Sequence, residues 1–338
     1  MNLADLPEVV RVGGFTPTSP PTHLLEGDKP VVFSDLVQSW PAVAGCRQSA
    51  ADAWNYLQQF ATEEPVTAYL GDEQFDGRFF YNQEFNGFNF RSGAAPLGAV
   101  LERLTNQRGQ ADAQTIYVGS TMVDKWLPGF RQANDLKLPS EQPLVSFWLG
   151  NQSRISAHYD YPDNVACVVA GRRRFTLFPP EQVENLYVGP MEHTPSGQTI
   201  SLVDFAQPDL QRFPKFAQAL EHAVVAELGP GDALFIPSMW WHHVESLSDF
   251  NLLVNYWWID SHQALGSPAA ALLHAIWAIR DLPARQKEGW QALLQHYVFA
   301  NDESTYAHIP EHARGCLAPL DEAGAQQLRA VLLNKLNN

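Results

Sequence analysis

The stretch GPGDALFIP, residues 229–237, indicates most directly how this chain folds. Its first four residues place proline and glycine where a type II turn requires them, and an apolar run of strand length follows at once. Similar short apolar runs, separated by turn residues, lie at 115–119, 144–149, 164–170, 172–178 and 251–258. Many short strands at such intervals are typical of a β-sandwich or barrel. We therefore predict a mainly β core over residues 111–261.

Different patterns flank this core. Residues 1–110 are expected to form an N-terminal α/β elaboration, with a strand at 29–33 and helices at 52–60 and 97–104. Residues 262–338 are expected to form a helical segment, because apolar residues recur at helical spacing over 268–282, 288–299 and 321–336. Within the core, the proline-containing interval 181–226 predicts a long surface insertion, with a helix near 209–221. Long insertions of this kind often form a substrate lid.

The bulk composition excludes several classes of function. The chain has 338 residues, of which 45% are hydrophobic, so it can bury a sizeable core. Its formal net charge of −15 argues against a surface that binds the phosphates of a nucleic acid. Three scattered cysteines are too few for a disulfide framework or a zinc cluster. The N-terminus lacks the pattern of a signal peptide, and no apolar run is long enough to span a membrane. We expect a soluble cytoplasmic protein that does not associate with membranes.

The run His158-Tyr159-Asp160 carries the clearest chemical signal. If it is a β-strand, alternation projects His158 and Asp160 from the same face, a suitable spacing for two metal ligands. A third ligand is available in Trp240-Trp241-His242-His243, where the paired histidines would face opposite ways. Two histidines and one carboxylate are the ligand set of non-haem Fe(II) oxygenases. The alternative is an ordinary hydrogen-bonded His158–Asp160 pair with histidines that belong to an aromatic cluster.

Arg173 is the second signal. In the strand-like run 172–178, Arg173 shares a face with Phe175 and Leu177, so it faces inward if they do, while Arg172, Arg174 and Thr176 face outward. A buried guanidinium requires an anionic partner, and its planar fork suits a carboxylate. That partner is either a dicarboxylate cosubstrate near the metal or an internal Asp or Glu.

Weaker polar signals lie within other apolar runs, at Tyr117, Asn164 and Asn255. Buried polar groups must find partners, so the default interpretation of all three is structural.

Three motifs taken together resemble the cupin-like JmjC oxygenases: HYD at 158–160, GRRRFTLFPP at 171–180 and GPGDALFIPSMWWH at 229–242. They are most similar to the branch that contains the asparaginyl hydroxylase of hypoxia-inducible factor. The similarity extends over residues 30–260, because KPVVFSDLVQSW at 29–40 looks like that family's N-terminal strand. The resemblance implies a double-stranded β-helix of the cupin or jelly-roll type, which uses Fe(II), 2-oxoglutarate as cosubstrate and O₂.

The family's metal ligands fall on His158, Asp160 and His242, and this alignment selects His242 over His243. These three residues are therefore the predicted catalytic and metal-binding set.

The cosubstrate residues of the family fall on Tyr117, which would hydrogen-bond 2-oxoglutarate, and on Asn164 and Asn255 beside it. Arg173 takes the place of the lysine that usually pairs with the distal carboxylate.

The resemblance implies an Fe(II)- and 2-oxoglutarate-dependent oxygenase, a hydroxylase of a protein side chain or a small molecule. The loops expected around the substrate pocket, 181–226 and 68–95, carry no chemical signature that separates these substrates, or hydroxylation from demethylation. The alternatives are a metal-dependent cupin that does not use 2-oxoglutarate and a non-catalytic cupin-like binding protein. Apolar residues of the C-terminal helices would suit a homodimer interface, and packing within one chain is the alternative.

Overall fold

The computed structural model describes residues 3–110, 113–140, 142–259 and 266–337. The chain divides into two compact units, Met1–Ile259 and Asp260–Asn338. The predicted boundary at 261/262 falls on residues outside the described ranges, and the one at 110/111 falls where a described range ends. The division of the first unit into an N-terminal elaboration and a β core stays a prediction.

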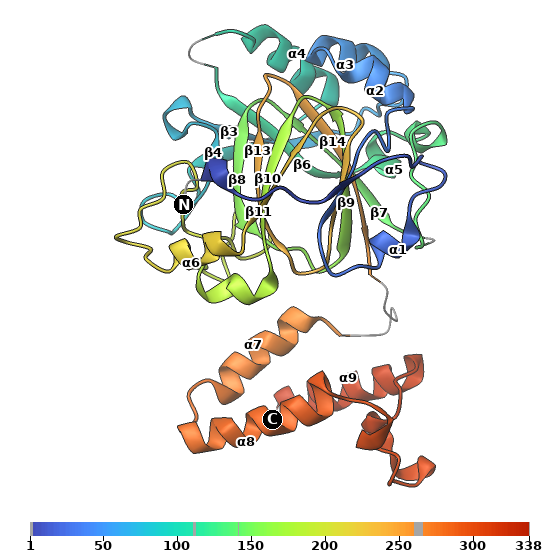
Figure 1. Cartoon of the computed structure of the whole chain (residues 1–338), viewed down its shortest axis with the longest axis vertical. Coiled ribbons are helices and arrows are strands. Elements are labelled where there is room, and N and C mark those ends of the chain that lie inside the picture. The colour runs from blue at the N-terminus through green and yellow to red at the C-terminus, as the bar shows by residue number, and fades with distance from the viewer. Residues whose placement is uncertain (1–2, 111–112, 141, 260–265, 338) are drawn as a thin grey trace. The chain divides into compact units, whose positions relative to one another are not determined.

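The first unit contains two β-sheets (Figure 1). Among the described residues the larger sheet has nine strands in the order β1-β2-β12-β9-β14-β7-β6-β3-β5. Their bounds are β1 Arg11–Val12, β2 Val31–Phe33, β12 Ala233–Ile236, β9 Asp163–Ala170, β14 Asn251–Trp258, β7 Leu144–Gly150, β6 Thr115–Met122, β3 Val66–Gly71 and β5 Phe90–Ala95. The smaller sheet has the order β11-β10-β13-β8-β4, with bounds β11 Val224–Leu228, β10 Arg173–Phe178, β13 Trp241–Ser246, β8 Ser153–His158 and β4 Arg78–Phe79.

A hydrophobic core lies between the two sheets. Phe175 and Leu177 of β10 and Val244 of β13 belong to one buried cluster with Val168 of β9 and Leu234 of β12. Facing sheets that share one core in this way form a jelly roll. The predicted mainly β, cupin-type fold is therefore confirmed.

Helices of the N-terminal part cover the larger sheet (Figure 1). The helices of the first unit other than α6 are α1 Thr22–Leu25, α2 Pro41–Cys46, α3 Ala50–Leu57, α4 Leu97–Gln107 and α5 Val123–Trp126. Proline at the first position of α2 and the Ser49 side chain, which accepts from the Asp52 N–H at the start of α3, fix two of these helix starts. Their apolar faces pack on Ile116 and Phe147 of the sheet.

The interval 181–226 is packed rather than loose. Its only described α-helix, α6 Phe216–Glu221, is shorter than the predicted 209–221, and Val224–Leu228 is strand β11. Phe205 and Phe216 of this interval form a buried cluster with Phe178 and Trp241 against the outer side of the smaller sheet. Thr176 faces the outer side of the smaller sheet as expected, in register with His243, and this layer buries it.

The second unit consists of helices α7 Pro268–Ile279, α8 Ala284–Leu294 and α9 Glu322–Leu336. Ser267 and Asp321 cap α7 and α9 by accepting hydrogen bonds from backbone N–H groups. None of the three helices has a described buried residue, and Trp277 is 72% exposed. These helices thus leave a large apolar surface open.

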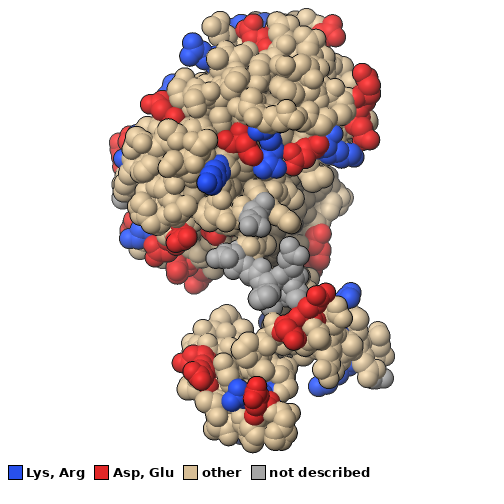
Figure 2. All heavy atoms as spheres, turned by 90° about the vertical axis from the view of Figure 1, so that its right-hand side faces the viewer, with Lys and Arg blue, Asp and Glu red and all other residues tan. Residues whose placement is uncertain are grey.

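The surface charge is mixed. On the face shown in Figure 2, Lys and Arg are interspersed with Asp and Glu. No helix of the described residues is long and apolar enough to cross a membrane.

Candidate metal centre

Two histidines face each other at the centre of the smaller sheet. His158, the last residue of β8, pairs in register with His242 of β13, and their ring centroids lie 4.3 Å apart. Each ring nitrogen Nδ1 lies at hydrogen-bond distance from a backbone carbonyl two residues earlier, Ser156 at 2.9 Å and Trp240 at 3.0 Å. These contacts hold both rings with Nε2 left for a ligand.

Asp160 completes the group. One side-chain ligand atom of each of His158, Asp160 and His242 lies within 4.8 Å of the others, and His242 Nε2 is 3.7 Å from Asp160 Oδ2. The strand does not run through Asp160 as expected but ends at His158. Asp160 is held instead from other elements: its carbonyl accepts from the Met239 N–H, and its Oδ2 accepts from Trp257 Nε1 at 3.2 Å.

The adjacent His243 faces away from this group. It is buried on the opposite side of the sheet, where its ring lies 4.5 Å from that of Phe205. Strand alternation therefore separates the two histidines, and the structure places only His242 beside His158 and Asp160.

Burial, and after it the neighbouring His158, lowers the pKa of His242 to about 4. The imidazole is therefore neutral at pH 7, the form that binds a metal ion. Two imidazoles and one carboxylate, with no other ligand group among the described residues of this cluster, suit a divalent metal with open coordination positions.

Arg173 lies beside the metal-ligand cluster, in a small inner cavity of about 50 Å³ lined also by Tyr117, Asn164 and Asn255. Its side chain is 4% exposed, its Nη2 donates to the Trp148 carbonyl at 3.3 Å, and its Nε has no partner in the structure. No Asp or Glu of the described residues forms an ion pair with it. Desolvation lowers the pKa of Arg173 to about 10, so it remains charged at pH 7.

The other predicted cosubstrate residues surround this guanidinium. Trp148 Nε1 donates to Asn255 Oδ1 at 2.6 Å, and Asn255 Nδ2 donates to Asn164 Oδ1 at 3.4 Å, which fixes the orientation of both amides. Burial raises the pKa of Tyr117, so its hydroxyl keeps its proton. The cavity therefore presents hydrogen-bond donors and one uncompensated positive charge.

The inner cavity adjoins an outer cavity of about 500 Å³, since Tyr117, Trp148 and the ligands His158 and Asp160 line both. Aromatic rings that the sequence did not single out line the outer cavity: Tyr69, Phe79, Phe88, Phe90 and Trp257. Most come from the expected pocket segment 68–95, and the run of aromatics at 79–90 was the available signal.

The interval 181–226 also reaches this opening. Residues 194–197 line the outer cavity, and His193 stacks on Phe88 with ring centroids 4.5 Å apart. Both segments that were expected around a substrate pocket therefore line the outer cavity.

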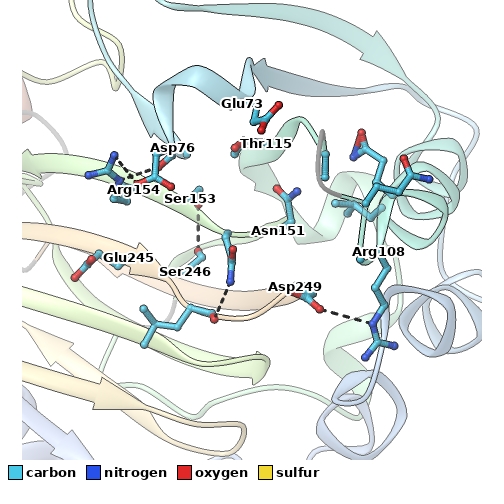
Figure 3. Close-up of a pocket in the computed structure, with 18 residues that line it drawn as sticks. Glu73, Asp76, Arg108, Thr115, Asn151, Ser153, Arg154, Glu245, Ser246 and Asp249 are labelled. Carbon is cyan, nitrogen blue, oxygen red and sulfur yellow. Dashed lines mark hydrogen bonds and ion pairs between the residues drawn. The ribbon is translucent and has the colours of Figure 1, made fainter. Parts of the chain in front are cut away.

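A second large opening lies elsewhere on the first unit (Figure 3). Its polar groups bond mainly to one another, as in Arg154–Asp76 at 3.2 Å and Arg108–Asp249 at 3.8 Å. It contains none of the three metal-ligand candidates, so we do not assign it a catalytic role.

The jelly roll places the chain in the cupin class, and its two histidines and one aspartate match the ligand set of non-haem Fe(II) oxygenases. Within that class, the model of the cupin-like domain family matches residues 18–264, and the chain belongs to this family. HSPB1-associated protein 1 of Homo sapiens is 39% identical over 260 residues, which cover 72% of this chain and 50% of that protein. Lysine-specific demethylase 8 of Xenopus tropicalis is 25% identical over 248 residues, covering 70% of this chain and 49% of that protein.

The chain thus spans about half the length of these curated relatives. A third relative, Jumonji C domain-containing protein 5 of Drosophila melanogaster, is 25% identical over 245 residues, covering 70% of this chain and 56% of that protein. These relatives support the JmjC-type oxygenase class at the level of the family. The finer similarity to the asparaginyl hydroxylase stays a prediction.

Proposed function

We propose that this protein is an Fe(II)- and 2-oxoglutarate-dependent oxygenase that hydroxylates its substrate. The observation that carries the proposal is Arg173, a buried guanidinium without a described acidic partner, in a cavity shared with His158, Asp160 and His242. A buried charge without a counterion is strongly destabilising. A dicarboxylate that reaches from the metal to Arg173 would supply the missing counterion, so the residues present fit both the metal and the cosubstrate.

His158, Asp160 and His242 would hold the iron, which together with 2-oxoglutarate and O₂ supplies the oxidising chemistry. Arg173 binds the distal carboxylate of the cosubstrate, and the Tyr117 hydroxyl donates a hydrogen bond to it. Trp257 holds the Asp160 carboxylate in one orientation through its indole N–H. The aromatic walls of the outer cavity limit the access of water to the reacting groups.

The test is the formation of succinate from 2-oxoglutarate by the Fe(II)-loaded protein in air, compared with Asp160→Ala. We expect succinate from the wild type and none from the variant, which loses its carboxylate ligand. Iron binding without succinate would favour a metal cupin that does not use 2-oxoglutarate. Failure to bind iron under anaerobic conditions would favour a non-catalytic binding protein.

Hydroxylation is our choice over demethylation, although two of the relatives bear the name lysine-specific demethylase, one of them JMJ31 of Arabidopsis thaliana. A demethylated product loses a methyl group as formaldehyde, whereas a hydroxylated product gains one oxygen, so mass spectrometry of the product separates the two reactions.

We also propose a cytoplasmic location and no nucleic-acid partner, in keeping with the net charge of −15.

We infer that the second unit mediates a homodimer. Large apolar side chains are exposed on each of its helices: Leu272, Leu273, Trp277, Trp290, Leu293, Val331, Leu332 and Leu333. Exposed large apolar side chains in such number often mark an interaction site. Symmetric pairing of these helices with those of a second copy would cover it.

A further inference from the structure

The edges of the two sheets differ in how well they are protected. Among the described residues, the edge strands are β1, β5, β11 and β4. Strands β1 and β4 are two residues long. The outer side of β11 is covered by the N-terminal segment, since the Val9 N–H donates to the Val225 carbonyl and the Val225 N–H donates to the Pro7 carbonyl. Only β5 is both long, at six residues, and free of a described outer neighbour.

Strand β5, Phe90–Ala95, also lacks the features that usually protect an edge. Proteins block exposed edges with charged side chains, prolines within the strand or bulges. In β5 the residues from Arg91 to Ala94 are exposed, and its one charged residue, Arg91, is ion-paired with Asp72 at 3.3 Å. Among the described residues no strand lies outside β5, so the outer backbone groups of this edge are open to a second backbone.

This edge leads directly to the metal cavity. Phe90 and Ser92 line the outer cavity together with His158 and Asp160. Ser92 pairs with Tyr69 of β3, which pairs with Tyr117 of β6, so one row of side chains runs across the sheet from the edge to the predicted cosubstrate tyrosine. A strand added to β5 would lie about 4.8 Å outside it and direct alternate side chains to the cavity side.

We propose that β5 binds an extended polypeptide segment as an additional strand, and that this segment delivers one of its side chains into the outer cavity. The backbone of the segment bonds to the free edge, which accounts for affinity, and its alternate side chains contact the aromatic wall formed by Tyr69, Phe88 and Phe90. The inference rests on the proposed oxygenase function and assigns its substrate to the polypeptides.

The cavity lining agrees with this choice of occupant. Apart from the ligands His158 and Asp160, the ionisable residues that line the outer cavity are tyrosines. A small substrate bound through its own charge would need a fixed counterion in this lining. Docking through backbone hydrogen bonds outside the cavity needs none.

The test uses the full-length protein and random 12-residue peptides displayed on phage, selected for binding and then synthesised. Two variants are compared with the wild type. Ala94→Lys places a charge on the exposed edge, where lysine disfavours strand addition. Thr67→Lys is the matched control, because Thr67 is exposed, pairs directly with Ala94 and faces the same side one strand further in. Melting temperatures of both variants verify that they are folded.

We expect selected peptides to lose at least tenfold in affinity for Ala94→Lys while Thr67→Lys binds them within about threefold of the wild type, since only the first blocks the edge. N-methylation along the peptide backbone should weaken binding at every second residue, the period of a strand ladder. Equal affinity for the two variants, no two-residue period, or a selection that yields no binding peptide would each overturn the proposal, and the last would favour a small-molecule substrate. Binding of 2-oxoglutarate at Arg173, measured separately, reports whether the oxygenase function itself holds.

Discussion

At the scale of single residues, Arg173 is held in the barrel without a described acidic partner. Its neighbours in the sequence behave differently: Arg172 and Arg174 are exposed or half-buried and both pair with Glu227. Of three consecutive arginines, two thus have a counterion and the buried one has no described acidic partner. This contrast supports the proposed role of Arg173 in binding a ligand.

Replacing Arg173 by methionine should therefore stabilise the ligand-free protein. Removal of an uncompensated buried charge is expected to contribute on the order of 1–2 kcal/mol, because methionine fills a similar volume without desolvation of a cation. The same variant should lose the rise in melting temperature that 2-oxoglutarate causes in the wild type. Thermal melts with and without 2-oxoglutarate measure both effects.

Arg172→Met is the matched control, since it removes an exposed arginine directly before the same strand. It should leave the stabilisation by 2-oxoglutarate unchanged. If Arg173→Met melted at a lower temperature than the wild type and were still stabilised by 2-oxoglutarate, the guanidinium would serve the fold and not the cosubstrate.

Trp257 positions the carboxylate of the proposed metal ligand Asp160. Its indole N–H donates to Asp160 Oδ2, so Trp257→Phe removes that hydrogen bond and keeps an aromatic ring in the wall. Loss of a hydrogen bond to a metal-ligating carboxylate typically costs about 10–100-fold in metal affinity, and we expect about tenfold here. Anaerobic titration with Fe(II) measures it. Trp258→Phe, at the adjacent buried tryptophan that stacks on Phe235, should bind iron as the wild type does, and equal affinities of the two variants would contradict this role.

The sequence revealed some of these residues and not others, for a physical reason. Strand alternation predicted an inward Arg173 on the face of Phe175 and Leu177, because this depends on neighbours in the sequence. It does not account for Asp160, since β8 ends at His158 and contacts from Met239 and Trp257 hold Asp160 beside it. The hydrogen bond of Trp257 to Asp160 joins residues 97 positions apart, and only the register of separate strands brings them together. The pairing of His242 with His158 is of the same kind, and the family resemblance was needed to select His242.

At the scale of elements, the interval 181–226 is tied to the barrel by a charged cluster. Asp204 accepts hydrogen bonds from Arg78 of β4 at 3.3 Å and from Arg154 of β8 at 3.1 Å. Its carboxylate also accepts from the Ala206 N–H, which fixes the local turn. One carboxylate therefore holds two part-buried guanidinium groups and the segment that follows it.

Asp204→Asn should loosen this interval. Two arginines would face each other without the carboxylate between them, at an expected cost of about 2 kcal/mol, since hydrogen bonds to charged groups contribute about 1.5–3 kcal/mol. The measurements are the free energy of unfolding in urea and the rate of proteolysis within 181–226. Asp209→Asn, in the same interval, removes a carboxylate that accepts only from the backbone in the described structure, and a loss of stability as large as that of Asp204→Asn would contradict the assigned role.

Elements were predicted best where the apolar pattern is simple. The predicted runs at 233–236 and 251–258 coincide with β12 and β14, since both strands are buried and bounded by turns. Strand β13, with the sequence WHHVES, was recognised only as a ligand motif, because it is buried on both faces and contains histidines on each. The burial of Thr176 had no local signal, because the covering layer comes from residues 205 and 216, which lie far along the chain.

At the scale of the whole molecule, the exposed apolar residues of the second unit predict that two copies of the protein associate. Its apolar helices expose Trp277 at 72% and Phe299 at 76%, values that are unusual for an isolated soluble unit. Trp277→Glu should place a charge in the proposed dimer interface and shift the protein toward the monomer. Light scattering after size exclusion, over a range of concentrations, measures the mass. Gln291→Glu adds the same charge at an exposed polar position of α8 and should remain dimeric, whereas a monomeric wild type would contradict the proposed dimer.

In our proposal, one cavity holds both a metal ion and 2-oxoglutarate. The most direct measurement is anaerobic calorimetric titration of the Fe(II)-loaded full-length protein with 2-oxoglutarate, beside Arg173→Met and Asp160→Ala. We predict saturable binding to the wild type and an affinity at least about 30-fold lower for Arg173→Met, since truncation of a buried charge partner costs about 2–5 kcal/mol. For Asp160→Ala we predict no iron-dependent binding. Iron binding by the wild type without any 2-oxoglutarate binding would contradict the claim.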